Sequence, residues 1–351
     1  MMTATTHERP GVYSSYEASS LTAAAANGGK VAVIAAVDGA KNLKDAYQWT
    51  SYSKAAADVG ECALSWLAQL AIRNGAGAVY GVPVKTGEGK KADYEAAFAV
   101  AEAIEDVSVV VCDSDDVEVQ QELREMVKTC SAARKERIAV VGGRAGETVE
   151  ELVKRAAGLN CERVVLVAPG MGDKSGGAGC AAAVAGAIAG TNDPALPLGG
   201  AQLYGLAGLE CGYDDGEIDE LVQGGVTALE TLAGAYYVVR GVTTRTTTGT
   251  APDATWRELS TILVVDEVIP GLRRALRARF SRAKNTRQTR GAIRSQTVME
   301  LEKRVSREII DSYEDVTVSA LEDDPTVCVV EFAFTVAHGL NQVWLSAHIT
   351  V

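Results

Sequence analysis

The sequence predicts an α/β fold in which a layered sheet is flanked by helices, followed by an α+β C-terminal domain, with extended terminal arms. Three observations support this prediction. Nearly continuous apolar runs alternate with segments of helical periodicity up to about residue 245, as in α/β proteins. Helical and then β-type segments follow from residue 246 onward. The chain begins with a short extended segment and ends inside an alternating strand.

Length and composition set the first limits. With 351 residues, of which 47% are hydrophobic and 23% charged, the chain should hold about two domains and a large core. The formal net charge of −12 argues against nucleic-acid binding by the whole surface. The N-terminus lacks the pattern of a signal peptide, and no run approaches the roughly 18 apolar residues of a membrane span. The seven cysteines form no CxxC pair, and this predicts buried reduced thiols.

The first segment, residues 1–24, is predicted to be an extended arm. Pro10 fixes φ and lacks an N–H, and Gly11 permits a positive φ, so the pair bends the chain rather than starting a helix. Val12 and Tyr13 then favour an extended backbone. A tail without its own core must stay disordered or pair with something else. The residues concerned are Arg9, Pro10, Gly11, Val12 and Tyr13.

Residues 25–245 are predicted to form the α/β part. Continuous apolar runs are typical of strands buried on both faces of a parallel sheet. A helical stripe lies between two of these runs, Thr148 with Glu151 predicts a capping box, and Gly158 can end that helix. The predicted strands are Val31–Val37, Ala78–Val84, Val107–Asp113, Arg137–Gly142 and Arg163–Pro169. The stripe consists of Val119, Leu123, Met126, Val127 and Cys130.

Residues 246–351 are predicted to form the α+β domain. Thr243–Thr250 before it reads as an exposed strand end or loop, and Leu259–Val265 as a strand. A helix is expected to start near Pro270, and Thr297 with Glu300 predicts a second capping box. Three strands are expected at the end of the chain, Val316–Leu321, Val327–Val336 and Val343–Val351. The last of them contains Val343, Trp344, Leu345 and Ile349.

A glycine-rich loop, Gly170–Gly179, is the strongest candidate for a phosphate site. It follows a predicted strand and precedes an Ala-rich helix, where backbone N–H groups attract anions. The P-loop pattern fails because Asp173 stands where glycine is needed before Lys174. A surface loop is the simpler interpretation, and a nucleotide-binding α/β enzyme that uses this loop stays as the alternative. Asp115-Asp116 reads as a helix start, and Asp214-Asp215 as part of a turn.

The charge distribution is informative near the C-terminus. Between Val268 and Met299 there are nine bases and no acid, so the rest of the chain carries −12 − 9 = −21. Such a run repels itself unless an acidic partner, either nucleic acid or protein, lies opposite. Phe280 is the single aromatic residue in the run, and this disfavours single-strand binding. The bases are Arg273, Arg274, Arg277, Arg279, Arg282, Lys284, Arg287, Arg290 and Arg294.

The chain resembles the tail sheath proteins of contractile-tailed bacteriophages and R-type pyocins. Arg9–Tyr13 is similar to the family's Pro-Gly-Val-Tyr arm, and Cys180–Asp193 with the Pro194–Pro197 loop is similar to its Ala-rich helix and turn. Tyr236–Arg245 resembles a strand with a Gly-x-Arg-Thr element, and Trp256–Val268 the start of the C-terminal domain. Leu198-Gly199-Gly200 and Gly225-Val226-Thr227 depart from the family pattern.

The resemblance implies a structural protein without catalytic residues, cofactor, metal, nucleic-acid partner or membrane insertion. It implies stacked hexameric rings around a tail tube, which contract to drive the tube through the cell envelope. Partners would be other copies, the tube protein, and baseplate and terminator proteins, in a virion tail made in the host cytoplasm. The α/β part would lie outside and the C-terminal domain inside, against the tube.

The resemblance also implies roles for particular residues. Arms would cross to neighbouring subunits and add strands there, which is β-augmentation. The arm residues are Arg9, Pro10, Gly11, Val12, Tyr13, Val343, Trp344, Leu345 and Ile349. The tube-facing bases are Arg273, Arg274, Arg277, Arg279, Arg282, Lys284 and Arg287.

Overall fold

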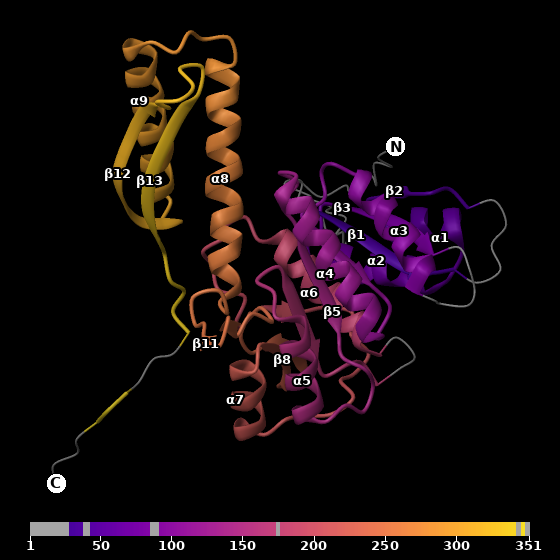
Figure 1. The fold of residues 1–351 in the computed structure, drawn as a ribbon. Helices are drawn as coiled ribbons and strands as arrows, with labels where there is room; N and C mark the ends of the chain where they lie inside the picture. The colour runs from indigo at the N-terminus through magenta and orange to yellow at the C-terminus, as the bar shows by residue number, and fades with distance from the viewer. Residues whose placement is uncertain (1–27, 38–42, 85–90, 173–175, 342–344, 348–351) are drawn as a thin grey trace, which may run out of the picture.

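A computed structural model describes residues 28–37, 43–84, 91–172, 176–341 and 345–347 (Figure 1). The described residues form one nine-stranded sheet and two two-stranded sheets. The large sheet has the order β2-β3-β1-β4-β5-β6-β8-β9-β7. No described helix is both long and apolar enough to cross a membrane. The arm residues Arg9, Pro10, Gly11, Val12, Tyr13, Val343, Trp344 and Ile349 lie outside the described residues.

Six parallel strands form the middle of the large sheet. β1 pairs with β3 on one side and with β4 on the other, and β5, β6 and β8 continue the parallel order. The five predicted strands are confirmed, and β8 adds a sixth. Antiparallel strands β2 (Tyr47–Trp49), β9 (Ala235–Val238) and β7 (Gln202–Leu203) complete the two edges. The parallel strands are β1 Lys30–Ala36, β3 Ala78–Val84, β4 Val109–Cys112, β5 Ile138–Gly142, β6 Val164–Ala168 and β8 Val226–Leu232.

Helices cover both faces of this sheet, so its central strands are buried on both sides. α1 (Tyr52–Val59), α2 (Ala63–Arg73) and α6 (Gly176–Gly190) share one apolar cluster with the sheet. The cluster on the opposite face takes residues from α3 (Lys91–Ala103), α4 (Val117–Ala132), α5 (Val149–Leu159) and α7 (Asp215–Gln223). The predicted stripe on α4 is buried, as expected. All seven cysteines are reduced thiols, and four of them are buried: Cys112, Cys130, Cys161 and Cys180.

Two helix ends differ from the prediction. The Thr148–Glu151 capping box is present, but α5 continues past Gly158 and ends at Leu159. Asn160 in the left-handed conformation closes that helix, with its N–H bonded to the Ala156 carbonyl. Asp214 belongs to a helix start rather than a plain turn, because it caps α7 in a box with Glu217. Asp116 caps α4, in agreement with the predicted helix start.

The threonine-rich stretch is only partly exposed. Thr243 and Thr244 are fully buried, and their hydroxyls donate to the Trp256 and Cys161 carbonyls, so these polar groups are satisfied inside the molecule. The prediction of an exposed strand end is therefore wrong for these two residues. The exposed part begins with β10 (Thr247–Thr248), which pairs with β11 (Ala251–Pro252).

The C-terminal helices also differ from the prediction. Leu259–Val265 is not a strand, and no helix starts at Pro270, because one helix, α8, runs over Leu259–Phe280 with Pro270 inside. The buried residues of α8 recur at helical spacing. Some of them pack against the sheet domain and others lie in the C-terminal apolar cluster. These tertiary contacts outweigh the strand preference of the β-branched residues. α9 (Arg287–Val305) is capped by Thr286. Thr297 lies inside α9, where its hydroxyl donates to the Ile293 carbonyl, so the second predicted capping box does not form.

A long hairpin packs on α9. β12 (Ile310–Ala320) and β13 (Cys328–Val336) are antiparallel and confirm the two strands predicted there, except that Leu321 and Val327 lie just outside them and β12 begins earlier, at Ile310. Figure 1 shows α8, α9 and this hairpin side by side in an elongated unit next to the sheet domain, with the C-terminal segment leaving at the end away from the hairpin turn. The third predicted strand, Val343–Val351, is not seen in Leu345–Ala347, which have no regular structure; its other residues lie outside the described part.

Candidate assembly surfaces

The β12–β13 hairpin has two unpaired edges. Within the described residues each strand pairs only with the other. Phe332, Phe334 and Val336 alternate along β13 and pack toward α9, so one face of the hairpin is supported. A two-stranded sheet is marginal alone, and its outer N–H and C=O groups are a template for further strands. Both outer edges of the hairpin therefore present backbone groups that no other described strand pairs.

Leu345 is the one predicted arm residue that the structure describes. Its relative exposure is 94%, and that of Leu340 just before it is 77%. Large apolar side chains this exposed mark sites of contact with other molecules when they lie together. The described C-terminal segment therefore has no apolar packing of its own at Leu345.

The basic segment divides into two groups. Some of its bases bind inside the molecule: Arg273 pairs with Glu136 at 2.9 Å, and Arg279 donates to Gln296. Arg290 donates to Asn285 at 3.0 Å and Arg294 to the Val316 carbonyl at 2.8 Å. In the described part of the chain, the other five side chains have neither hydrogen bond nor ion pair: Arg274, Arg277, Arg282, Lys284 and Arg287.

The outer end of the C-terminal unit carries both signs of charge. The Asn285 side-chain amide donates to the Pro325 and Val327 carbonyls at 2.8 and 3.1 Å, so the loop after α8 lies beside the β12–β13 turn. That turn carries Glu322, Asp323 and Asp324, whereas the loop carries Arg282 and Lys284. No ion pair joins the two sets among described side chains.

Ion pairs attach α8 to the sheet domain. Arg163, which precedes β6, donates two hydrogen bonds from its guanidinium group to the two carboxylate oxygens of Asp266 on α8, at 2.7 and 2.8 Å. Only 10% and 17% of these two side chains is exposed. The Arg273–Glu136 pair adds a second attachment nearer the basic end of α8. The bidentate geometry is the strong form of an ion pair, so this contact holds α8 against the sheet domain.

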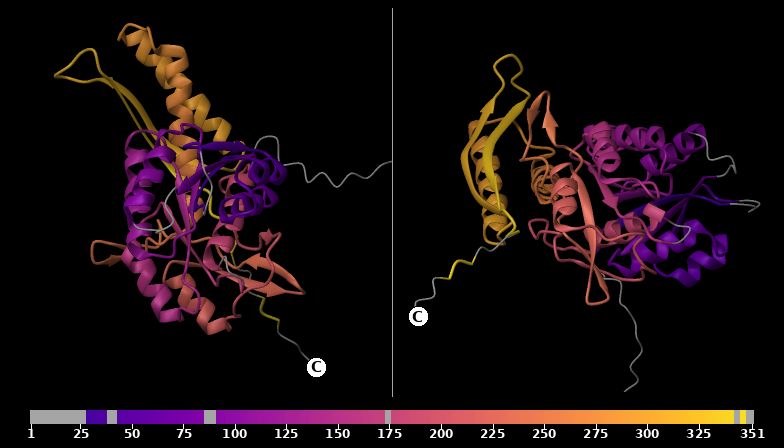
Figure 2. Two further views of the ribbon diagram at one scale, coloured as in Figure 1. Left: turned by 90° about the vertical axis from the view of Figure 1, so that its right-hand side faces the viewer. Right: turned by 90° about the horizontal axis from the view of Figure 1, so that it is seen from below.

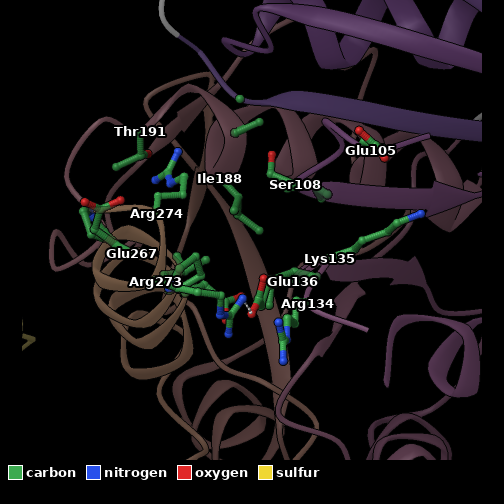
Figure 3. Close-up of a pocket in the computed structure, with 18 of the residues that line it drawn as sticks. Glu105, Ser108, Arg134, Lys135, Glu136, Ile188, Thr191, Glu267, Arg273 and Arg274 are labelled. Carbon is green, nitrogen blue, oxygen red and sulfur yellow. Dashed lines mark hydrogen bonds and ion pairs between the residues drawn. The ribbon is translucent and has the colours of Figure 1, made fainter. Parts of the chain in front are cut away.

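A pocket of about 630 Å³ lies between α8 and the amino ends of the central strands, and we call it the α8 groove (Figure 3). Val109, Ile138, Ile188 and Leu263 supply apolar lining. Figure 3 shows the Arg273–Glu136 pair inside it, with Arg134 and Lys135 on the sheet side and Arg274 on the α8 side. The basic lining residues are Arg134, Lys135, Arg273, Arg274 and Arg277.

The glycine-rich loop is explained by close packing where it is described. A Cβ on Gly177 would lie 2.2 Å from the Gly143 carbonyl oxygen, so α6 approaches the end of β5 backbone to backbone. The pocket beside this loop contains Glu147 and Glu210. Its Arg144 is paired with Asp115 at 3.3 Å. Acids and a neutralised base suit a phosphate poorly. Residues 173–175 of this loop lie outside the described part.

A polar cluster joins β1, β4 and α3 at the carboxyl ends of the strands. Asp113 accepts hydrogen bonds from the Ala36 amide at 2.9 Å and the Tyr94 hydroxyl at 2.7 Å. Burial raises the pKa of Asp113, and burial likewise raises the pKa of the Cys112 thiol to about 12. Burial thus favours the neutral forms of both groups. Because Asp113 has its hydrogen-bond partners inside the molecule, the cluster is a structural feature of the sheet domain.

Two family models match the sequence over most of its length. The "Phage tail sheath protein central domain" matches residues 87–244, and the "Phage tail sheath C-terminal domain" matches residues 251–350. The chain belongs to the phage tail sheath proteins. The resemblance found in the sequence is confirmed, and this sheath protein is a structural component of a phage-type tail.

Relatives of known structure share the fold. The anti-feeding prophage helical sheath in the contracted state is similar, with TM-score 0.72 and 14% identity over 98% of this chain and 99% of that one. A sheath tail protein from Listeria innocua gives TM-score 0.71 and 14% identity over 89% and 92%. A chain in the anti-feeding prophage baseplate gives TM-score 0.73 and 14% identity over 99% and 100%. These matches confirm the predicted fold class.

A curated relative supports the family by sequence. The tail sheath protein of Bacillus phage SP01 is 27% identical over 253 residues. That match covers 69% of this sheath protein but only 43% of the relative's length.

Sequence reasoning located the basic segment but missed two features of these surfaces. The α8 groove joins residues far apart in the chain, for which no motif exists. The segment between the first two strands predicted near the C-terminus was not singled out as a binding surface, although its three successive acids, Glu322, Asp323 and Asp324, are visible in the sequence.

Proposed function

We propose that this sheath protein polymerises as stacked hexameric rings around a tail tube and contracts to drive the tube through the cell envelope. The observation that carries the proposal is the β12–β13 hairpin, a supported sheet with two unpaired edges. The similar anti-feeding prophage chain forms a helical sheath in a contracted state. A heterologous contact that does not close generates such a helical array.

The strands that fill these edges are the terminal arms of neighbouring copies. They carry Arg9–Tyr13 at one end and Val343, Trp344, Leu345 and Ile349 at the other. Each strand added to an edge contributes about 0.5–1.5 kcal/mol net per hydrogen bond, or a few kcal/mol per junction. Such links hold copies together while the globular bodies move. Contraction then releases energy stored during assembly and needs no catalytic residue or cofactor.

The basic segment faces an acidic tail tube. The unpaired Arg282, Lys284 and Arg287 at the outer end are the members of the predicted set that remain available for this role. Arg273 is bound to Glu136 and Arg279 to Gln296, while Arg274 and Arg277 line the α8 groove. Repeated ion pairs of this kind set docking and register more than affinity. The remaining partners are baseplate and terminator proteins in a virion tail made in the host cytoplasm, with no nucleic acid and no membrane insertion.

Deletion of residues 1–20 tests the arm. We expect a folded monomer that no longer forms tubes in negative-stain microscopy, because the neighbour's hairpin edge stays empty. Deletion of residues 1–8 is the matched control, since it keeps Arg9–Tyr13 and should still polymerise. Normal tubes from the longer deletion would refute the linkage.

Charge reversal tests the tube-facing role. Arg282→Glu with Arg287→Glu should abolish co-assembly with tube protein and leave the melting temperature unchanged, because both side chains are exposed. Arg307→Glu is the matched control, an exposed base beyond α9. Unchanged co-sedimentation with the tube protein would contradict the assignment.

A further inference from the structure

The α8 groove has more positive charge than its own acids neutralise. Of the acids that line it, Glu136 is paired with Arg273, and Asp266 with Arg163. Glu267 lies 3.6 Å from Arg304, and Glu105 remains.

On the basic side, the Lys135 ammonium donates to the Glu102 carbonyl at 3.1 Å. Arg134, Arg274 and Arg277 have no carboxylate among the described residues. In the described part of the chain, the groove therefore offers three guanidinium groups without a carboxylate partner, against the one unpaired carboxylate of Glu105, around an apolar lining. This excess of positive charge suits an acidic segment with apolar flanks.

A segment of that kind exists in this chain. The turn between β12 and β13 carries Glu322, Asp323 and Asp324, and Leu321 and Val327 on either side are 43% and 39% exposed. Hydrogen bonds from Thr326 hold the pKa of Asp324 below its usual value, so this carboxylate stays charged. Figure 2 shows the turn projecting beyond the helices of its unit.

The turn and the groove do not meet within one molecule. Asn285 holds the turn beside the loop after α8, and no described ion pair joins its three acids to a groove base. The two surfaces have opposite charge, one protrudes and the other is concave, and both combine apolar with charged groups. Their contact must join two copies, and it is heterologous because the two surfaces differ.

We infer that the α8 groove of one copy receives the acidic β12–β13 turn of a second copy, with Arg274 and Arg277 facing Asp323 and Asp324. This inference rests on the proposed self-assembly and adds a contact that is separate from the strand exchange by the arms. The opposite charges set the orientation of the two copies in this contact. Leu321 and Val327 then cover the apolar lining of the groove.

The test is a charge swap in the full chain. Arg274→Glu with Arg277→Glu, or Asp323→Lys with Asp324→Lys, should each raise the concentration of half-maximal assembly about tenfold, because like charges then oppose each other. An equimolar mixture of the two double variants should assemble nearly as the original, since each turn then finds a groove of opposite charge. Asp219→Lys with Glu220→Lys on α7 is the matched control, with no effect. Sedimentation measures assembly, and thermal melting confirms folding.

Two outcomes would overturn the inference. One is poor assembly of the groove variant together with normal assembly of the turn variant. That result would mean that the groove binds the tube or another partner and not the turn. The other is a mixture of the two variants that fails to recover. Failure of the arm linkage is read separately, from the deletion of residues 1–20, so the two proposals can fail independently. Should a charge reversal impair folding, Arg277→Gln and Asp323→Asn replace it, with a smaller loss expected from each.

Discussion

At the scale of single residues, buried charges decide how the two parts of this sheath protein meet. Arg163 and Asp266 are mostly withdrawn from water and hold each other with two short contacts. A buried pair of this kind adds little net stability over an apolar pair, but losing one partner leaves an uncompensated charge. The pair therefore specifies the position of α8 more than it adds to stability.

We expect Asp266→Ala to destabilise the chain by about 3–5 kcal/mol, because the Arg163 charge stays buried alone. Arg163→Met with Asp266→Leu should restore most of that loss. The exposed Lys30–Asp106 pair is the control, since water screens it and Asp106→Ala should cost much less stability. Urea unfolding measures each difference, and equal losses for Asp266→Ala and Asp106→Ala would contradict the argument.

Asp113 gives a prediction about pH. Burial raises the pKa of this carboxyl, against the hydrogen bonds from Tyr94 and Ala36. With a folded pKa above the unfolded value of about 3.9, its stabilising contribution is complete below that value and is lost as pH rises through the folded pKa. Asp113→Asn is neutral throughout and keeps an acceptor for the Ala36 amide. It should flatten the fall in unfolding free energy above about pH 4, and an unchanged slope would disprove this origin.

At the scale of elements, small residues set how closely helices approach the sheet. α6 is rich in glycine and alanine and is buried on nearly all sides. Gly142 and Gly177 place the end of β5 against the first turn of α6 with no room for a side chain. Gly158 on α5 has open space around it instead. Glycine is thus required at the first contact and not at the second position.

Two alanine substitutions test this difference. Gly177→Ala should destabilise the chain by at least about 2 kcal/mol, because its Cβ would overlap backbone that cannot move aside. Gly158→Ala should stabilise it by about 0.5–1 kcal/mol, since alanine suits a helix interior better. Thermal melting of both variants gives the comparison. A loss of stability in Gly158→Ala would contradict the argument that packing does not require glycine at this position.

At the scale of the whole molecule, stability and assembly depend on different parts of the chain. The sheet domain and the unit of α8, α9 and the hairpin contain the three apolar clusters. The described C-terminal residues Leu340 and Leu345 lie mostly in solvent. Folding should therefore tolerate the loss of the C-terminal segment, whereas assembly should not.

We expect deletion of residues 342–351 to change the free energy of unfolding by less than about 0.5 kcal/mol, as for surface changes, and to abolish tubes in negative-stain microscopy. Leu345→Ala alone should weaken assembly, because it shortens the apolar face of the added strand. Deletion of residues 350–351 is the control and should assemble normally. A marked loss of stability in the longer deletion would mean that the segment packs on its own subunit.

Much of the fold could be predicted from local patterns. The five continuous apolar runs became parallel strands, since a strand buried on both faces needs apolar residues at every position. Leu259–Val265 was misread because a short β-branched run suits either a buried strand or a buried helix, and only its contacts decide between them. Thr297 was misread because a capping pattern inside a longer helix has no free N–H groups to cap.

The candidate surfaces were predictable only in part. Nine bases without an acid are visible in the sequence. This segment is positive while the rest of the chain is negative, and the contrast indicated a binding segment. That Arg273 is neutralised by Glu136, while Arg274 beside it is not, depends on which helix face meets the sheet domain. Sequence spacing alone does not contain this information.

Local patterns in the chain were enough to predict the alternation of strands and helices, the family and the run of arginines, because each of these is visible in short stretches of sequence. Three further features follow from contacts in the folded molecule: α8 is one helix, Arg163 and Asp266 attach it to the sheet domain, and a basic groove lies beside it. The physical reason is that burial and charge pairing are set by residues more than 100 positions apart, as Arg163 and Asp266 are.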